Sequence, residues 1–375
     1  MPEIWLKYGT TDVVLDIRFD NLASQVSSPI KPIPEEQVRS ALEGVPLADN
    51  MLVTALSPSK SVSRAVIMLA EAARAKGFGV TIDVPARIAG MLRAQLTSLP
   101  GGEAIPINRV DHSHFHDRAG KFSSAISVSA VSYDPLFGFG GAPTAILRNF
   151  LPEKMEEAYR ARPEDNIPSP GVEGNPLRIA GEAMQNIAAT SVELVTGSSG
   201  IAAVHVGTLQ DAFGEAVSDL RSMSLVEEDP SKCAVISASS EQAVQSNLSS
   251  SLNSLWNNIH IVKEGGVAVL LAECREGLGG GALQMFVEGR LKPDQVISAP
   301  YSDGLEHLVF AGELRKKYDL GLVSTLPRYY AGTMLGFGTY SGMSEVLQSL
   351  PEKLGKNYRA IVLSDSDITL VRPRI

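Results

Sequence analysis

The sequence predicts an α/β protein made of two α/β domains with largely parallel sheets and a cleft between them. Short apolar runs alternate with helical stretches almost from end to end, the order that βαβ units produce. The chain has 375 residues, which is long for a single hydrophobic core. The alternation restarts after a polar, proline-containing break at "EEDPSK" (227–232). We therefore predict domains at 1–225 and 226–375.

The N-terminal half contains a strand–helix–strand unit. "MLVTAL" (51–56) and "FGVTIDV" (78–84) are typical of strands, and the segment between them, 61–77, carries its apolar residues on one helical face and ends in a glycine. Such a crossover is right-handed and its two strands are parallel. Further strands are predicted at 11–17 and 124–132, and the segment 160–176, rich in Pro, Gly and acids, is predicted to be an exposed loop.

The C-terminal half repeats the alternation. A helix is predicted from about 240 to 263. Strands are predicted at 233–238, 266–272, 295–300, 320–326 and 359–365. Two α/β domains that face each other leave a cleft, which is the usual place for a ligand.

Composition excludes several classes of protein. A formal net charge of −9 argues against nucleic-acid binding, which needs a surplus of Lys and Arg on one face. No run of 18 apolar residues exists, so no membrane span is expected. Cys233 and Cys274 do not make a disulfide framework. The first residues carry acids and a strand-like alternation instead of a signal peptide, and we expect a cytoplasmic protein.

Four blocks of sequence carry a resemblance. They are "VVLDI" (13–17), "GFGGAPTAIL" (138–147), "EGNPLR" (173–178) and, above all, "VKEGGVAVLLAECREGLGG" (262–280). In content and spacing they resemble the nickel-dependent lactate racemase family over essentially the whole chain. The resemblance implies a two-domain α/β protein with its active site between the domains. In that family a nickel pincer nucleotide takes hydride from a 2-hydroxy acid and returns it to either face.

The positions that carry the family's chemistry differ in this sequence. The lysine that anchors the nucleotide falls on Thr144, which has no amine, and a histidine before the glycine-rich loop becomes Asp134. A nickel-binding histidine falls near Arg160, and the turn that carries an acid–base histidine falls near 83–87, which has none. The helix before the longest block, Tyr-Gln-Ala-Gln-Lys in the family, reads "SSSLN" (249–253) here. We therefore expect no covalently attached nucleotide and leave the cofactor unknown.

Candidate site residues follow from these alignments and from local pattern. Lys60 opens a helix after a strand, at the position of the family's carboxylate-binding arginine, so the turn is a candidate anion site; the alternative is a helix cap with a solvated lysine. Arg275 lies at a strand's carboxyl end, where an ion pair with a neighbouring glutamate is the alternative. The assigned residues are Lys60, Asp134 and Arg275 as catalytic, and Gly138, Gly140, Gly141, Thr144, Ser250 and Asn253 as cofactor-binding; no metal ligand is assigned.

Two weaker patterns complete the set. His112, His114 and His116 in "VDHSHFHDR" (110–118) share one face of an extended segment, and such histidines chelate zinc or nickel; a flexible polar loop is the alternative. Asp303 and His307 follow a predicted strand end, where an acid–base pair is one interpretation; a pair on a helix surface is the alternative, and no motif supports the acid–base pair.

Three functions are compatible with the sequence. The first is a racemase or epimerase that acts on a small 2-hydroxy acid in the cleft with altered or absent pincer cofactor. The second is a non-catalytic protein that binds a small carboxylate or phosphate on the same scaffold. The third is a metal-dependent isomerase or hydrolase that uses the histidine-rich segment.

Overall fold

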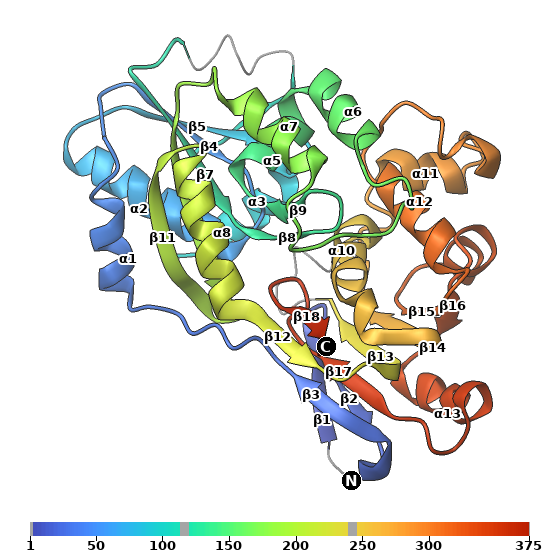
Figure 1. The fold of residues 1–375 in the computed structure, drawn as a ribbon. Coiled ribbons are helices and arrows are strands. Elements are labelled where there is room, and N and C mark those ends of the chain that lie inside the picture. The colour runs from blue at the N-terminus through green and yellow to red at the C-terminus, as the bar shows by residue number, and fades with distance from the viewer. Residues whose placement is uncertain (1–2, 113–119, 239–245, 375) are drawn as a thin grey trace.

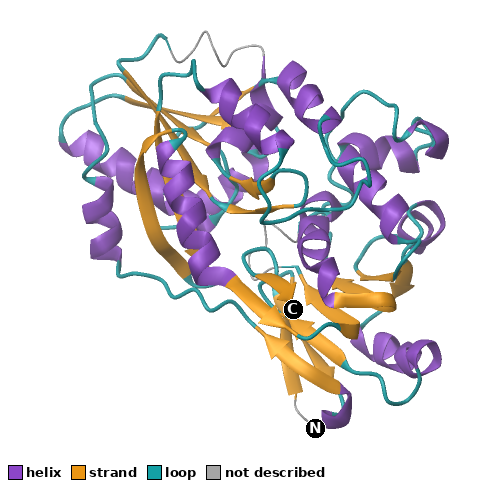
Figure 2. Cartoon of the chain, in the orientation of Figure 1, coloured by secondary structure: helices purple, strands orange, loops and turns teal. Residues whose placement is uncertain are grey.

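The protein is an α/β protein with two large sheets, as predicted. The computed structural model describes residues 3–112, 120–238 and 246–374. Each of two six-stranded sheets occupies its own half of the molecule and is flanked by helices (Figures 1 and 2). None of the helices in these described ranges is long and apolar enough to span a bilayer.

The first sheet has the strand order β11-β10-β7-β4-β5-β6. All neighbours are parallel except the edge pair β10 and β11, which is antiparallel. Its strands are β4 (Met51–Ala55), β5 (Val80–Pro85), β6 (Asn108–Val110), β7 (Ser124–Ala130), β10 (Thr190–Gly197) and β11 (Gly200–Thr208). The helices of this half are α1 (Glu35–Leu42), α2 (Lys60–Ala75), α3 (Ala89–Thr97), α5 (Ala142–Phe150), α6 (Pro152–Arg160), α7 (Asn175–Met184) and α8 (Asp211–Ser224).

The predicted strand–helix–strand unit is β4, α2 and β5. Every residue of β4 is buried, as expected for a central parallel strand that is covered on both faces. Helix α2 begins where the Ser59 hydroxyl accepts a hydrogen bond from the Val62 amide at 3.1 Å, which satisfies a backbone donor that the helix itself leaves free. Its apolar face, including Val66 and Leu69, packs into the core of this sheet.

The second sheet is entirely parallel, with the order β16-β15-β14-β13-β17-β3. Its strands are β3 (Leu22–Val26), β13 (Ser231–Ser237), β14 (Val262–Leu271), β15 (Asp319–Val323), β16 (Gly338–Tyr340) and β17 (Ala360–Leu363). The helices of this half are α10 (Leu248–Asn258), α11 (Gly281–Val287), α12 (Leu305–Leu314) and α13 (Met343–Leu354), with a π-helical turn at Tyr329–Met334.

Three two-stranded sheets complete the fold. The pairs are β1 (Glu3–Tyr8) with β2 (Thr11–Asp16), β8 (Ser132–Asp134) with β9 (Gly138–Gly140), and β12 (Leu225–Glu228) with β18 (Leu370–Pro373). Short 3-10 turns lie at Phe19–Asn21, Ile259–Ile261 and Pro293–Gln295.

The N-terminal segment belongs with the second sheet. Strand β3 pairs in parallel with β17, and the Asn21 side chain before it donates to the carbonyls of Tyr358 at 2.7 Å and Lys356 at 3.0 Å. Both ends of the chain therefore lie in the same half of the molecule (Figure 1). The second sheet thus draws one strand from outside 226–375, and a division into domains at 225/226 stays a prediction.

One predicted strand is wrong. Residues 295–300 form turns after the 3-10 turn Pro293–Gln295, although "QVISAP" has strand-like composition. The prolines on both sides interrupt backbone pairing, and Ile297 is left 57% exposed. Of the predicted helix 240–263, Leu248–Asn258 is helical, and residues 239–245 lie outside the described ranges. The predicted end is wrong, because Ile259–Ile261 form a 3-10 turn and Val262 already begins β14.

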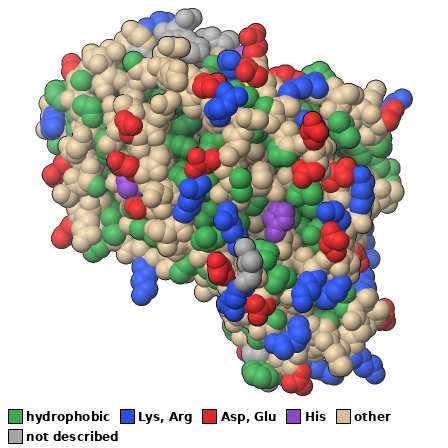
Figure 3. All heavy atoms as spheres, viewed as in Figure 1, with side chains coloured by type: hydrophobic (Ala, Val, Ile, Leu, Met, Phe, Trp, Pro, Cys, Tyr) green, Lys and Arg blue, Asp and Glu red, His purple; other side chains and the backbone are tan. Residues whose placement is uncertain are grey.

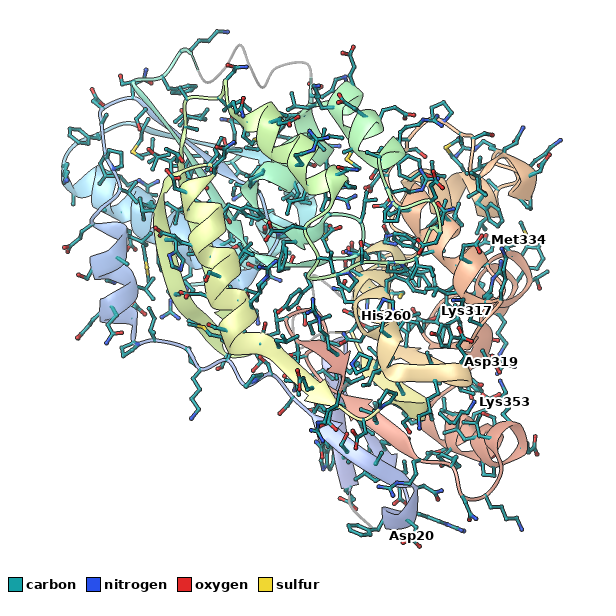
Figure 4. The ribbon with its side chains drawn as sticks, in the orientation of Figure 1. Asp20, His260, Lys317, Asp319, Met334 and Lys353 are labelled. Atoms are coloured by element: carbon teal, nitrogen blue, oxygen red, sulfur yellow. The ribbon has the colours of Figure 1, made fainter. Side chains whose placement is uncertain are left out.

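The surface carries charges of both signs. Lys, Arg, Asp and Glu are interspersed over the face seen in Figure 3. Many of these charges are paired. Lys353 on α13, for example, lies 2.6 Å from Asp319 on β15 and joins the helix to the sheet (Figure 4).

Candidate functional site

A cavity of about 520 Å³ lies where the carboxyl ends of strands from both sheets meet. The segments that follow β4, β5 and β7 supply its walls from the first half, and those that follow β13 and β14 supply them from the second. The carboxyl edge of parallel strands is where open α/β sheets bind ligands. Its polar lining consists of Ser57, Arg87, Ser132, Asp134, Thr144, Arg148, Asn149, Asn247, Ser249, Ser250, Asn253, Glu276, Asp303, Glu306 and His307.

Helix N-termini surround this cleft. Helix α5 begins at Ala142 beside Gly140 and Gly141, and α10 begins after Asn247, whose side chain accepts from the Ser250 amide at 3.0 Å. Helix α12 begins just after Asp303. Each N-terminus carries a partial positive charge, which favours an anionic group nearby. The first amides of α5 and α10 are already bound within the protein: Ala142 donates to the Glu193 carboxylate at 2.8 Å, and Leu248 and Ser249 donate to the carbonyls of Gly277 and Leu278.

Arg148 lies at the centre of the cleft wall and joins the two halves. Its guanidinium is 3.1 Å from Asp134 of β8, 2.6 Å from Glu306 of α12, and donates to the Tyr301 hydroxyl at 2.9 Å. The Arg148 side chain is 13% exposed and that of Glu306 only 2%. Burial alone lowers the pKa of Arg148, but Asp134, Tyr301 and Glu306 hold that pKa well above its ordinary value.

Backbone hydrogen bonds orient the Asp134 carboxylate toward Arg148. Its Oδ1 accepts hydrogen bonds from the backbone amides of Leu136 and Phe137, each at 2.8 Å, as an Asx turn does. The arginine also lies over the Phe137 ring, 4.9 Å from its centroid, a cation–π contact.

A second ion pair spans the cleft. Arg87, in the turn after β5, pairs with Asp303, in the loop before α12. Both side chains are about one-third exposed. Burial raises the pKa of Asp303, but Arg87 and Arg148 outweigh this and lower the pKa of the carboxyl overall.

His307 completes the polar wall from α12. Its Nδ1 accepts a hydrogen bond from the indole Nε1 of Trp256 at 3.1 Å, and the residue is 3% exposed. Burial, and to a smaller extent Arg148, lowers the pKa of His307, so the imidazole is neutral at pH 7.

Comparison with known proteins shows which fold builds this cleft. No protein-family model matches the chain, and no curated protein matches its sequence. The lactate racemase apoprotein from Thermoanaerobacterium thermosaccharolyticum superposes with a TM-score of 0.78 at 16% identity, over 99% of this chain and 100% of that one. A structural-genomics protein from Thermotoga maritima superposes with a TM-score of 0.64 at 10% identity, over 93% and 100%.

The chain has the lactate racemase fold. This confirms the fold that the resemblance implied. It does not transfer an activity, because identities this low establish fold alone.

On this lactate racemase fold, six of the predicted site residues lie together in the cleft: Asp134, Gly140, Gly141, Thr144, Ser250 and Asn253. Thr144 acts as part of the loop itself. Its hydroxyl accepts from the Gly141 amide at 3.0 Å and donates to the Gly141 carbonyl at 3.1 Å, so it closes the first turn of α5. Asp303 and His307, noted in the sequence as an acid–base pair, also line the cleft.

Three predicted residues lie elsewhere. Lys60 is exposed and lines a separate cavity of about 420 Å³. Of the two interpretations of this turn, the helix cap is present, at Ser59. Arg275 is 66% exposed and pairs with Glu273 at 2.6 Å, the ion pair weighed as its alternative. Gly138, predicted to bind cofactor, has φ +83° and a position where a Cβ would lie 1.9 Å from the Val172 carbonyl oxygen, so close backbone packing accounts for it.

The glycines that follow Arg275 also serve packing. At Gly281 (φ +59°) a Cβ would lie 2.0 Å from the Asp303 carbonyl oxygen, and at Gly279 (φ +89°) it would lie 2.5 Å from the Asn247 side chain. The turn can therefore run directly against both segments that border the cleft.

Sequence reasoning missed Arg148, Glu306 and the Trp256 contact of His307. A usable signal existed for the first, because Arg148 lies four residues after Thr144 on the same helical face. Glu306 and the Trp256–His307 contact depend on packing between distant parts of the chain, which local sequence patterns do not predict.

The donor set of this cleft does not fit the family's nickel pincer nucleotide. Its lining residues include one histidine and neither lysine nor cysteine, whereas covalent attachment requires an amine. In the described part of the chain, no group of three His, Cys, Asp or Glu is arranged to hold a metal. His112 is exposed, and His114 and His116 lie outside the described residues, so a metal site there stays a prediction.

The role of Gly138 can be tested by substitution. Gly138→Ala forces a side chain into a left-handed conformation and against the Val172 carbonyl, and we expect the free energy of unfolding to fall by about 2 kcal/mol or more. Gly214→Ala is the matched control, since a Cβ in this part of α8 meets nothing within 4 Å; it should be neutral or stabilise by about 0.5–1 kcal/mol. Denaturant unfolding of both variants measures this, and an unchanged stability of Gly138→Ala contradicts the packing explanation.

Proposed function

We propose that this lactate-racemase-like protein binds a small 2-hydroxy acid in the cleft between its two sheets. One observation carries the proposal: the N-termini of α5 and α10 open onto a cavity that also presents Ser132, Ser250 and Asn253. The partial positive charge at helix N-termini favours a carboxylate, and the neutral hydroxyl and amide side chains can form hydrogen bonds with its oxygen atoms and with a hydroxyl group. The volume of about 520 Å³ lies in the range of small-molecule sites.

The charges favour a carboxylate over a phosphate. Four carboxylates and two arginines line the cleft: Asp134, Glu276, Asp303, Glu306, Arg87 and Arg148. Each arginine is already paired with a carboxylate inside the protein. No side-chain cation in this set is left to neutralise a second negative charge, and like charges close together are unfavourable. A monoanion is therefore the better ligand.

Calorimetric titration with lactate, glycerate, malate and inorganic phosphate tests this. We expect saturable binding of a 2-hydroxy acid, weakened at least tenfold by Ser250→Phe, which fills the cleft; tenfold corresponds to about 1.4 kcal/mol. Ser222→Phe makes the same change on the exposed face of α8 and should bind within about twofold of wild type. Lys60→Glu should do likewise, because Lys60 lies outside the cleft. Preferential binding of phosphate, or loss of binding in Lys60→Glu, contradicts the proposal.

Isomerisation of the bound acid is the second candidate function. It is favoured by two groups in the same cavity. The carboxylate of Asp134 can accept a proton from a ligand, and the imidazole of His307 can donate a hydrogen bond to it. In this reading the protein is a racemase or epimerase with altered cofactor handling.

Incubation of a single enantiomer in deuterated water tests the second candidate. We expect conversion to the other enantiomer, measured by chiral chromatography, and Asp134→Asn should slow it at least tenfold because it removes the group that accepts the proton. Mass spectrometry of the product shows whether hydrogen at C2 comes from solvent. Retention of configuration with the binding site saturated rejects an isomerase and leaves the binding function.

A further inference from the structure

The hydrogen bond between Trp256 and His307 determines where the imidazole carries its proton. An indole N–H is a donor only, and it points at His307 Nδ1 from 3.1 Å. Nδ1 must therefore be the unprotonated nitrogen. A neutral imidazole has one N–H, so the proton lies on Nε2.

The surroundings keep the imidazole in this form. Burial is the largest influence and lowers the pKa of His307; Arg148 also lowers it, whereas Glu306, Asp303 and Asp134 raise it by less. A second proton would have to sit on Nδ1, facing the indole N–H. Both effects disfavour the imidazolium at neutral pH.

The other side of the ring faces the cleft. His307 is one of the residues that line the cavity. No hydrogen bond to its Nε2 occurs within the described ranges, and this nitrogen is not among the buried polar atoms that lack a partner. Trp256 itself is fully buried, so the indole holds the ring from behind and leaves the Nε2 edge toward the open space.

We propose that His307 is a ligand-binding residue whose Nε2–H donates a hydrogen bond to an oxygen atom of the acid in the cleft, with Trp256 as its positioning residue. This rests on the proposed function and adds to it. In this tautomer the imidazole is a donor and not a base, so the ligand must present an acceptor, a carboxylate or hydroxyl oxygen, at this point. An ammonium group is excluded from this part of the cleft, because it has only donors.

Nitrogen-15 NMR of the histidine rings in the full-length protein tests the tautomer without any ligand. We expect Nε2 of His307 to be protonated and Nδ1 to be unprotonated from pH 6 to 8. Trp256→Phe removes the donor to Nδ1 and should give a mixture of tautomers or a proton on Nδ1. A proton on Nδ1 in the wild type overturns the proposal.

Binding variants test the contact itself. His307→Gln keeps an N–H donor and should bind the 2-hydroxy acid within about threefold of wild type, whereas His307→Leu removes the donor and should weaken binding at least tenfold. Circular dichroism confirms that each variant is folded. Equal affinities of wild type and His307→Leu overturn the role of His307 and leave the proposed function intact. Absence of binding by the wild type, with the tautomer as expected, rejects the proposed function and this contact with it.

Discussion

A buried guanidinium held by carboxylates from both halves of the molecule is the interaction on which the cleft depends. Arg148 belongs to α5 and meets Asp134 of β8 on one side and Glu306 of α12 on the other. Removing a charge from water costs several kcal/mol, and an unpaired buried charge is not tolerated. Each of the three charges is therefore stable only when its partners are present, and the two ion pairs hold α12 against α5. Contacts from Arg160 of α6 to the carbonyls of Ser298 and Ala299 reinforce the same junction.

This arrangement also determines what the cleft offers a ligand. Because Arg148 and Arg87 are already paired, the groups left for recognition are mainly hydroxyls, side-chain amides and one imidazole. The imidazole is itself held in place by Trp256, which is buried in the hydrophobic core beside the second sheet. The cleft is therefore polar and carries more carboxylates than arginines, and the ligand that we propose for it is a small hydroxylated monoanion.

The sequence predicts local features well and long-range ones poorly. β4, α2 and β5 follow from apolar periodicity and from the cap at Ser59, all of which act within a few residues. The position of β3 beside β17 does not, because strand pairing across more than 300 residues leaves no local trace. At the site, the glycine-rich loop and Asp134 were identified from the family blocks. Lys60 and Arg275 were placed in the site because each follows a strand. In the structure Lys60 lines a separate cavity, and the exposed Arg275 pairs with Glu273. Glu306 was missed because its partner Arg148 is 158 residues away.

The most direct test of this account is a double-mutant cycle between Arg148 and Glu306, followed by denaturant unfolding. Arg148→Met leaves Asp134 and Glu306 buried without their cation, and the account predicts a loss of about 3–5 kcal/mol in the free energy of unfolding. Combining it with Glu306→Met removes one orphaned charge, so the double variant should lose at least about 1 kcal/mol less than the sum of the two single variants. A loss below about 0.5 kcal/mol for Arg148→Met, or strict additivity of the two substitutions, would contradict the claim that this buried ion cluster holds the two halves together.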